Sequence, residues 1–401
     1  MSAEVPLFLW LASGVSVALS LLPILAAARF GSYVRRERKK QRPPFAPVAS
    51  VILPCKGLDQ EFEENIRSIL DQNYPDFEVV FVTATDDDPA CAAIRRMLAE
   101  PGHARAKLVV AGFSERRSEK VNNQLRGIAG AREDAEVFVF VDSDVCAGKS
   151  FLRDLVAPLQ EAGVGASTGF RWYDAEGGGV AGYLQSAWNG GGLTLLADPR
   201  TAYAYGGAMA ILRRTFQEAG VGARWDNTLS DDMMLTQAVS AAGLAIHFVP
   251  ACMTVSRERR TLAGVLEWTN RQTIVLKVYA FRKWAFIFVM HATLAVALVA
   301  GLALTLAGLA ANRPIVWPGI LMLSVVAAEC LGGLLILQAV RRVLPSIRFA
   351  PARTALLIGC APLAMLLILC NNLHSLTTNE IQWRGTVYRI SGERTTIVRR
   401  V

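Results

Sequence analysis

The ten residues Val-Phe-Val-Phe-Val-Asp-Ser-Asp-Val-Cys, at positions 137–146, constrain the fold more than any other segment. Five apolar, β-favouring residues in a row predict a strand that is buried on both faces, as in a parallel sheet. The strand runs directly into Asp142 and Asp144. Ligands of open α/β sheets bind beyond the carboxyl ends of the strands, where two carboxylates can hold a divalent cation that neutralises a diphosphate. The alternative interpretation is a plain Asp-rich turn that closes the strand.

The chain before this strand alternates between strand and helix patterns. The patterns predict strands at 51–53, 79–82 and 107–110 and helices at 61–72, 90–98 and 122–131. Repeated βαβ units imply right-handed crossovers and a doubly wound, mainly parallel sheet. We therefore predict an α/β domain over residues 50–256, of the kind that binds nucleotides at the ends of its strands.

Long apolar segments indicate that the chain also enters a membrane. Hydrophobic residues make up 52% of the chain, and the mean hydropathy is +0.32. About twenty apolar residues cross a bilayer. Runs of about that length occupy residues 7–28, 286–310, 315–340 and 355–371. We predict one transmembrane helix within residues 1–28 and about three within residues 285–371.

Basic residues beside the apolar segments predict the orientation of the chain. Residues 29–49 form a basic linker after the first span, so the positive-inside rule puts the N-terminus outside and the α/β domain in the cytoplasm. Four spans would leave the basic tail, residues 372–401, outside, whereas its arginines favour the inside. Pro362 offers a further possibility, a last span broken into a re-entrant hairpin. A bacterial inner membrane and, in a eukaryote, the Golgi membrane both fit this topology.

The net charge indicates which kind of partner the chain binds, and the cysteine content indicates the redox compartment of the α/β domain. The formal net charge is +8, and the excess lies beside apolar spans, which favours an anionic membrane surface over nucleic acid. The seven cysteines are scattered and never form Cys-x-x-Cys. We expect neither a disulfide framework nor a zinc site, and a reducing environment for the α/β domain.

Polar residues near the other predicted strand ends and helix starts are candidate nucleotide contacts. Lys56 follows the first strand and is placed to contact a phosphate, and Asp86 follows the second and is placed to accept a hydrogen bond from a base or ribose. Lys120 and Asn123 open a later helix, where a cation can reach an anion. The alternatives are a glycine turn after the first strand and helix capping at the other two places. The residues to which we assign capping instead are Asp87, Asp88 and Asn122.

A second acidic pair, Asp231 and Asp232, follows Ser230 where a loop enters a predicted helix. A carboxylate there can act as a general base that takes a proton from an attacking hydroxyl. The alternative is that Ser230 caps the helix and both aspartates interact with the positive end of its dipole.

Two further segments have distinctive compositions. Residues 257–284 are basic and amphipathic and predict one or two helices on the membrane surface. Within them we single out Arg271, because an arginine fork can bind diphosphate oxygens; contact with lipid headgroups is the alternative.

Residues 165–220 are rich in glycine and predict mobile loops near a ligand. Aromatic residues that could line an acceptor pocket there, or simply pack, are Trp172, Tyr173, Tyr183, Trp188, Tyr203 and Tyr205.

Taken in order, these motifs resemble the inverting, processive-type glycosyltransferases that use nucleotide sugars, and more narrowly the ceramide glucosyltransferases. The resemblance covers nearly the whole chain, and the order of the motifs is more specific than any one of them. The closest segments are Lys56-Gly57-Leu58-Asp59, Tyr74-Pro75, Asp87-Asp88-Pro89-Ala90, Asn122-Asn123, the strand end at Asp142, residues 207–214, residues 230–232 and Trp383-Arg384-Gly385.

The resemblance implies a GT-A-like α/β domain, anchored by the apolar spans, that transfers a sugar with inversion. It implies that Asp142 and Asp144 hold Mg²⁺ or Mn²⁺ against the diphosphate of a UDP-sugar. Asp232, with Asp231 beside it, would be the base, and Arg271 would contact the diphosphate. The implied partners are the UDP-sugar, with glucose preferred, a ceramide-like lipid acceptor and the bilayer, but no nucleic acid; the oligomeric state stays open.

Two positions depart from the family pattern. If Asp88-Pro89 is aligned with the family's Asp-Pro, the family's base-reading aspartate falls on Thr85, and Asp86 is a neighbouring substitute. The family's Gln/Arg-x-x-Arg-Trp motif corresponds to Trp268-Thr269-Asn270-Arg271-Gln272, in which the arginine alone is kept.

Three other functions remain open from the sequence. A polysaccharide synthase would use the same core but needs more spans for a channel. Another lipid glycosyltransferase would differ in its donor or in its acceptor, for example diacylglycerol or a polyprenyl phosphate. A membrane scaffold or small transporter is the non-enzyme alternative, against which the retained carboxylates and the large α/β domain argue.

Overall fold

The computed structural model describes residues 4–101, 105–347, 350–392 and 394–400. Contacts between Cα atoms divide the chain into two compact units, each assembled from separate stretches of sequence. Unit 1 consists of Met1–Val34, Tyr173–Leu195 and Arg259–Thr378. Unit 2 consists of Arg35–Trp172, Leu196–Glu258 and Asn379–Val401. Arg348, one of the basic residues between the last two predicted spans, lies outside the described residues.

Unit 2 is built on a seven-stranded sheet with the order β3-β2-β1-β4-β6-β5-β7. Strands β3, β2, β1 and β4 are parallel neighbours, whereas β6 runs antiparallel to both β4 and β5. The predicted α/β, mainly parallel sheet is confirmed. The strands are β1 (Ala49–Pro54), β2 (Phe77–Thr83), β3 (Ala106–Val110), β4 (Val137–Val141), β5 (Val164–Tyr173), β6 (Ala208–Leu212) and β7 (Ala245–Ser256).

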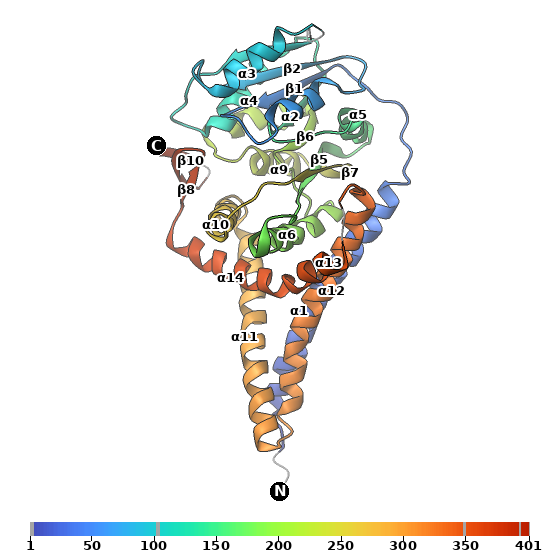
Figure 1. The fold of residues 1–401 in the computed structure, drawn as a ribbon, viewed down its shortest axis with the longest axis vertical. Coiled ribbons are helices and arrows are strands. Elements are labelled where there is room, and N and C mark those ends of the chain that lie inside the picture. Colours follow the sequence, from blue (N-terminus) through green and yellow to red (C-terminus); the bar gives the residue numbers. More distant parts are fainter. Residues whose placement is uncertain (1–3, 102–104, 348–349, 393, 401) are drawn as a thin grey trace. The chain divides into compact units, whose positions relative to one another are not determined.

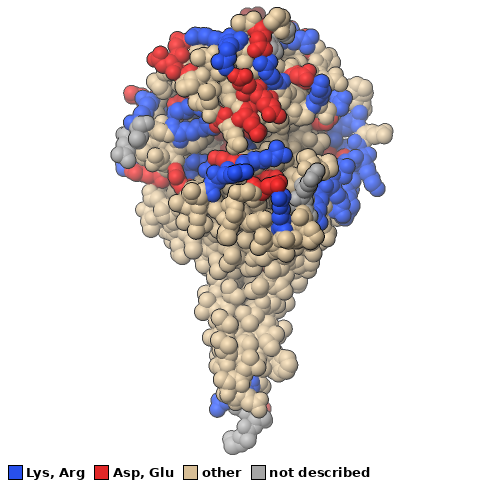
Figure 2. Space-filling view, viewed as in Figure 1, with Lys and Arg blue, Asp and Glu red and all other residues tan. Residues whose placement is uncertain are grey.

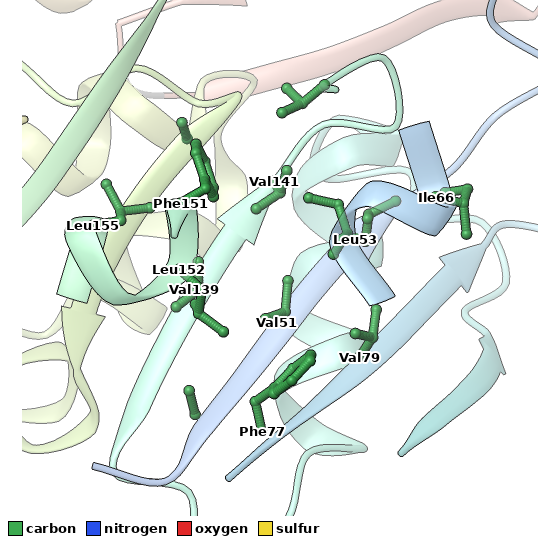
Figure 3. Close-up of a cluster of buried hydrophobic side chains, with 14 of the residues drawn as sticks. Val51, Leu53, Ile66, Phe77, Val79, Val139, Val141, Phe151, Leu152 and Leu155 are labelled. Atoms are coloured by element: carbon green, nitrogen blue, oxygen red, sulfur yellow. The ribbon is translucent and has the colours of Figure 1, made fainter. Parts of the chain in front are cut away.

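Helices cover both faces of this sheet because its central strands are apolar on both sides. Odd-numbered residues of β1, β2 and β4, such as Val51, Val79 and Val139, point to one face, where α2 and α5 pack on them (Figure 3). Even-numbered residues such as Phe140 point to the other face, where Trp225 lies 5.1 Å away, centroid to centroid. The helices of unit 2 are α2 (Phe62–Leu70), α3 (Pro89–Leu98), α4 (Glu119–Ala129), α5 (Phe151–Val156), α7 (Arg213–Glu218), α8 (Val221–Arg224) and α9 (Asp231–Ala241).

Side-chain caps fix where the site helices begin. Asp88 caps α3 by accepting a hydrogen bond from the Ala90 backbone N–H, which confirms the capping prediction for Asp88, whereas Asp87 is not the cap. Ser230 caps α9, as the alternative interpretation of that segment expected. The capping prediction for Asn122 is wrong. Ser118 caps α4 instead, so the helix begins nearly a turn earlier and Asn122 lies within it.

The glycine-rich segment is more regular than predicted. Mobile loops were expected over residues 165–220, but β5, α6 (Gly179–Leu193), β6 and α7 occupy most of it. Glycine serves here in close packing. A Cβ atom on Gly169 would lie 2.3 Å from the backbone oxygen of Cys252, so β5 accepts no side chain at that point.

Unit 1 is a set of long helices. Among the described residues, four apolar helical segments are long enough to cross a membrane: α1 (Leu7–Glu37), α11 (Phe281–Ala311), α12 (Val316–Val343) and the segment Pro351–Thr377. Helices α1, α11 and α12 run lengthwise beside one another (Figure 1). Leu294, Val325 and Met365 bring α11, α12 and α14 together in a small apolar core. Figure 2 shows few charged side chains over these helices, whereas charged residues cover unit 2.

The last candidate span is broken where Pro362 predicts a break. Helix α13 (Pro351–Gly359) ends just before α14 (Ala361–Thr377), whose first turn contains the proline. The amphipathic segment forms one helix, α10 (Leu262–Tyr279), after which α11 begins. The interfacial position of α10 stays a prediction.

The C-terminal tail folds as a sheet of its own, which the sequence did not predict. Strands β8 (Glu380–Trp383), β9 (Thr386–Ser391) and β10 (Arg394–Arg400) pair antiparallel in the order β10-β9-β8. Ile381, Tyr388 and Ile390 of this sheet are buried. The Glu119 backbone N–H at the start of α4 donates a 3.4 Å hydrogen bond to the Tyr388 hydroxyl, which joins the tail to the rest of unit 2.

Candidate active site

Lys120 connects three separate segments of unit 2. Its Nζ atom lies 2.8 Å from Asp142 Oδ1 at the end of β4 and 3.1 Å from Asp231 Oδ2 at the start of α9. It also donates a 3.1 Å hydrogen bond to the backbone oxygen of Gly206. The structure therefore brings together Lys120, Asp142 and Asp231, which the sequence analysis selected independently.

The first turns of α4 and α9 are tied to each other, which explains this convergence. Ser118, the cap of α4, donates from its hydroxyl to the Leu229 backbone oxygen at 2.8 Å, and its backbone N–H donates to the Thr228 oxygen at 3.0 Å. One turn further along α4, Gln124 Nε2 donates to Asp231 Oδ2 at 2.7 Å. Two polar helix starts, each buried against the other, thus fix the acidic pair relative to the sheet.

The two aspartates of the acidic pair differ in their surroundings. Asp231 is buried, with 4% of its surface exposed, and burial raises its pKa although Lys120 acts in the opposite direction. Asp232 is only partly buried. Its Oδ1 accepts hydrogen bonds from the Ser230 hydroxyl and the Met233 backbone N–H, while its Oδ2 accepts a long 3.3 Å bond from the Gly206 backbone N–H.

The two glycines beside these carboxylates leave little room for a side chain. A Cβ atom on Gly206 would lie 2.9 Å from both Asp231 Oδ2 and Lys120 Nζ, and one on Gly207 would meet the ring of Tyr205 at 2.6 Å. The Gly207 backbone oxygen accepts a 3.3 Å hydrogen bond from the Asp142 N–H. The backbone of this glycine pair therefore contacts both Asp142 and Asp232.

Arg171 of β5 holds the other acidic pair. Its guanidinium makes a two-pronged contact with the Asp144 carboxylate and lies 3.6 Å from Asp142 Oδ2. Burial raises the pKa of Asp144, but the charge and hydrogen bonds of Arg171 outweigh it and hold the pKa below its usual value. The oxygen atoms of Asp142 and Asp144 are thus paired with two cations, Arg171 and Lys120.

A divalent cation fits this donor set in one specific way. Hard cations such as Mg²⁺ prefer carboxylate oxygens and complete their shell with water and substrate phosphates. Among the described residues, no group of three or more His, Cys, Asp or Glu side chains is arranged to hold a metal ion. Two partly exposed carboxylates at a strand end therefore suit a cation that a donor diphosphate helps to bind, rather than a metal held by protein alone.

The remaining predicted nucleotide contacts of unit 2 have partners other than the Lys120 cluster. Lys56 follows β1 and forms a 2.8 Å ion pair with Glu119 at the start of α4. Asp86 is exposed and forms an ion pair with Arg95 of α3. Asn123 is buried within α4, where its Nδ2 donates a 3.5 Å hydrogen bond to the Val82 backbone oxygen.

Arg271 and several of the aromatic residues belong to unit 1. Arg271 lies on α10. Near it, the ring centroid of Trp268 is 5.1 Å from those of both Tyr173 and Trp188. Trp188 Nε1 donates to Asn371 Oδ1 at 3.1 Å, and Asn371 Nδ2 donates to Thr269 and Asn270 on α10. These aromatic side chains pack with one another around a polar contact between α6, α10 and α14.

Several residues of the site were missed by sequence reasoning. Arg171 stands between Phe170 and Trp172 in a buried strand, and a buried cation needs an anionic partner, so this pattern was a usable signal. Gln124 and Ser118 gave no comparable signal, because their partners come from loops about a hundred residues away.

Comparison with known proteins assigns the family. The model described as "Glycosyl transferase family 21" matches residues 9–396. The chain belongs to glycosyl transferase family 21. A ceramide glucosyltransferase of Komagataella phaffii is 26% identical over 137 residues, which are 31% of this chain and 26% of that protein. Ceramide glucosyltransferase 1 of Caenorhabditis elegans is 30% identical over 105 residues, 26% of this chain and 22% of that protein. The chain thus aligns with about a quarter of the length of these curated relatives.

The fold of this family 21 member is also found in a solved structure. A mannosyltransferase of Pyrobaculum calidifontis, in complex with GDP-Man and Mn²⁺, superposes with a TM-score of 0.51 at 18% identity. The superposition covers 91% of this chain and 99% of that one. At this identity the likeness concerns the fold, and the predicted GT-A-like domain with apolar helices is confirmed.

Proposed function

We propose that this family 21 member transfers a sugar, preferably glucose, from a UDP-sugar to the hydroxyl of ceramide or a similar lipid, with inversion. The observation that carries the proposal is the cluster in which Lys120 connects Asp142, at a strand end, with the acidic pair at the start of α9. Family membership and the two distant ceramide glucosyltransferases support the reaction class and the acceptor.

Asp232 is the general base in this proposal. Its Oδ1 is held by Ser230 and Met233, which fixes the carboxylate, and its Oδ2 has the weaker contact with the Gly206 N–H. Oδ2 takes the proton of the acceptor hydroxyl as that oxygen forms its bond to the anomeric carbon. The bond from that carbon to the diphosphate breaks on the opposite face, so the configuration inverts.

Asp231 has a different role, because its buried carboxylate is occupied by Lys120 and Gln124. It orients Lys120 and the start of α9. Asp142 and Asp144 would hold Mg²⁺ or Mn²⁺, which supplies positive charge to the leaving diphosphate. Lys120 and Arg171 are fixed cations beside the same carboxylates, and they limit the repulsion between those carboxylates and an anionic donor.

Unit 1 anchors the enzyme in this proposal. Its four candidate spans embed it in a membrane, and unit 2 faces the cytoplasm, where nucleotide sugars are supplied. Arg271, Lys56, Asp86 and Asn123 remain proposed donor contacts. Of these, Asp86 is the weakest, since it is exposed and paired with Arg95.

The test is a transfer assay on the purified full chain in detergent or lipid nanodiscs. Labelled UDP-glucose, UDP-galactose and GDP-mannose are each offered with ceramide, diacylglycerol or a polyprenyl phosphate. We expect Asp232→Asn to lower transfer by about a hundredfold or more, because an amide cannot accept the proton. Binding of the donor, measured by calorimetry, should persist.

Asp226→Asn is the matched control for this substitution. Asp226 lies in the same unit but is partly exposed and pairs with Arg116 and Arg117, so its loss should leave transfer unchanged. Near-normal turnover of Asp232→Asn would refute the assignment of the base. Transfer to another lipid would correct the acceptor and keep the reaction class.

A further inference from the structure

The C-terminal tail places an arginine beside the proposed donor site. Arg384 and Gly385 form the two-residue turn between β8 and β9, in which Trp383 pairs with Thr386. Their φ angles are 44° and 75°, as a type I′ hairpin turn requires at both central positions. Asn-Gly is the favoured sequence for this turn, and a bulky residue is disfavoured in the left-handed region. The turn geometry alone therefore does not account for an arginine here.

The side chain of Arg384 reaches the loop that follows β1. Its Nη1 donates a 2.7 Å hydrogen bond to the Lys56 backbone oxygen, and its Nη2 lies 2.7 Å from Asp59 Oδ1. The guanidinium thus clamps both ends of the Lys56-Gly57-Leu58-Asp59 segment. The loop that carries Lys56 is held by the tail, from more than three hundred residues away in sequence.

Asp59 also contacts the turn after β4 that contains Asp142 and Asp144. Its second oxygen, Oδ2, accepts a 2.6 Å hydrogen bond from the Ser143 hydroxyl. Ser143 is buried, with 4% of its surface exposed, and it stands between Asp142 and Asp144. Arg384, Asp59 and Ser143 therefore form a continuous polar chain from the tail to the turn that presents both carboxylates.

Charge supports the same connection. Burial lowers the pKa of Arg384, but the carboxylates of Asp59, Asp144 and Asp142 outweigh it and raise the pKa above its usual value. The Arg384 side chain keeps 37% of its surface exposed.

We infer that Arg384 is a positioning residue of the donor site, which acts through Asp59 and Ser143 to hold the Asp142-Ser143-Asp144 turn for a divalent cation and a nucleoside diphosphate. The inference rests on the proposed function, because it assumes that this turn binds the donor. Partners that orient metal ligands typically contribute ten- to a hundredfold to metal affinity. The tail is thus part of the donor site rather than a mere surface extension.

The decisive substitution is Arg384→Asn, because Asn suits the turn and removes the guanidinium. Binding of UDP in the presence of Mn²⁺ is measured by calorimetry on the purified full chain, together with its melting temperature and the kinetics of transfer. We expect an unchanged or higher melting temperature and about tenfold weaker binding of UDP with Mn²⁺. The KM for the donor should rise accordingly while kcat at saturation changes little.

Two further variants test the route of the effect. Ser143→Ala should weaken the binding of UDP with Mn²⁺ by a similar factor. The double variant Arg384→Asn with Ser143→Ala should bind UDP about as tightly as the single variant with the lower affinity, because both substitutions break the same chain of contacts. Arg384→Lys should restore part of the affinity. The control is Arg389→Ala, since Arg389 lies in the same hairpin and forms an exposed ion pair with Glu380.

The outcomes separate this inference from the proposed function. Two results would overturn this inference and leave the proposed function intact. One is wild-type affinity for UDP in Arg384→Asn, and the other is a loss of affinity in the double variant that equals the product of the losses in the two single variants. Wild-type protein that binds UDP with Mn²⁺ but transfers no sugar to any lipid would refute the proposed reaction and leave the inference intact. Absence of UDP binding by the wild type would overturn both.

Discussion

Lys120 shows how one side chain can hold a site together. Its side chain is 14% exposed, and two aspartates and a backbone oxygen surround its Nζ atom. Burial lowers the pKa of Lys120, but the charges of Asp142 and Asp231 outweigh it and raise the pKa. The lysine therefore stays charged, and it neutralises carboxylates that would otherwise repel each other and an incoming donor.

Replacing Lys120 with Met should be severely destabilising. Removal of one partner of a buried ion pair leaves the other charge uncompensated, which costs about 3 kcal/mol or more. We expect a clearly lower melting temperature for unit 2 and loss of UDP binding, measured on the purified chain. Lys149→Met is the control, because Lys149 and Asp71 are exposed and lie 3.2 Å apart, so that pair contributes little. Equal melting temperatures for the two variants would contradict the role given to Lys120.

Among the secondary-structure elements, helix α4 positions the site residues Lys120 and Gln124 relative to the sheet. It carries Lys120 and Gln124 toward the carboxylates, and its last turn packs closely on β1 and β2 at Gly127. A Cβ atom at Gly127 would lie 2.5 Å from Ile52 Cγ2 and 3.0 Å from Val82 Cγ2. Both neighbours are branched at Cβ and buried, so they have little freedom to move.

Gly127→Ala should therefore shift α4 away from the sheet. We expect a loss of about 1–3 kcal/mol in stability, the usual range for overpacking, together with weaker donor binding because Lys120 moves with the helix. Thermal unfolding and UDP calorimetry would measure both. Gly148→Ala is the matched control, since no atom lies within 4 Å of a Cβ built there. If the two alanine variants behaved alike, the close contact at α4 would not constrain the site.

At the scale of the whole molecule, each unit is assembled from three stretches of the chain. The polypeptide enters unit 2 after the first long helix, leaves it for unit 1 at Tyr173 and again at Arg259, and returns for its last residues. Neither unit is therefore a continuous segment that could be produced by simple truncation. The tail, residues 379–401, completes unit 2 through Tyr388 and Arg384 although it follows all four candidate spans.

Ending the chain after Thr378 should affect the two units differently. Unit 2 loses the buried residues Ile381, Tyr388 and Ile390, so we expect a lower melting temperature and faster proteolysis of the sheet-containing unit. Unit 1 keeps its four candidate spans, so the shortened chain should still resist extraction from membranes by alkaline carbonate. Unchanged proteolysis of unit 2 would show that the tail contributes nothing to it.

Features of this protein that depend on local pattern could be predicted from the sequence. The apolar run at 137–141 required a doubly buried strand, the βαβ rhythm required parallel neighbours, and Ser230 and Asp88 stand where a helix needs an acceptor at its start. Because Asp142 follows a central parallel strand, its position at a ligand-binding edge was also implied.

The pairs of distant side chains that meet could be identified only from the folded chain. Arg171 pairs with Asp144, Gln124 with Asp231, and Arg384 with Asp59, although none of these partners is near in sequence. The antiparallel strands after β4 and the folded tail were likewise missed, because pairing between remote segments leaves no periodic signature. The physical reason is that a buried charge requires a partner, while the chain pattern does not say which segment will supply it.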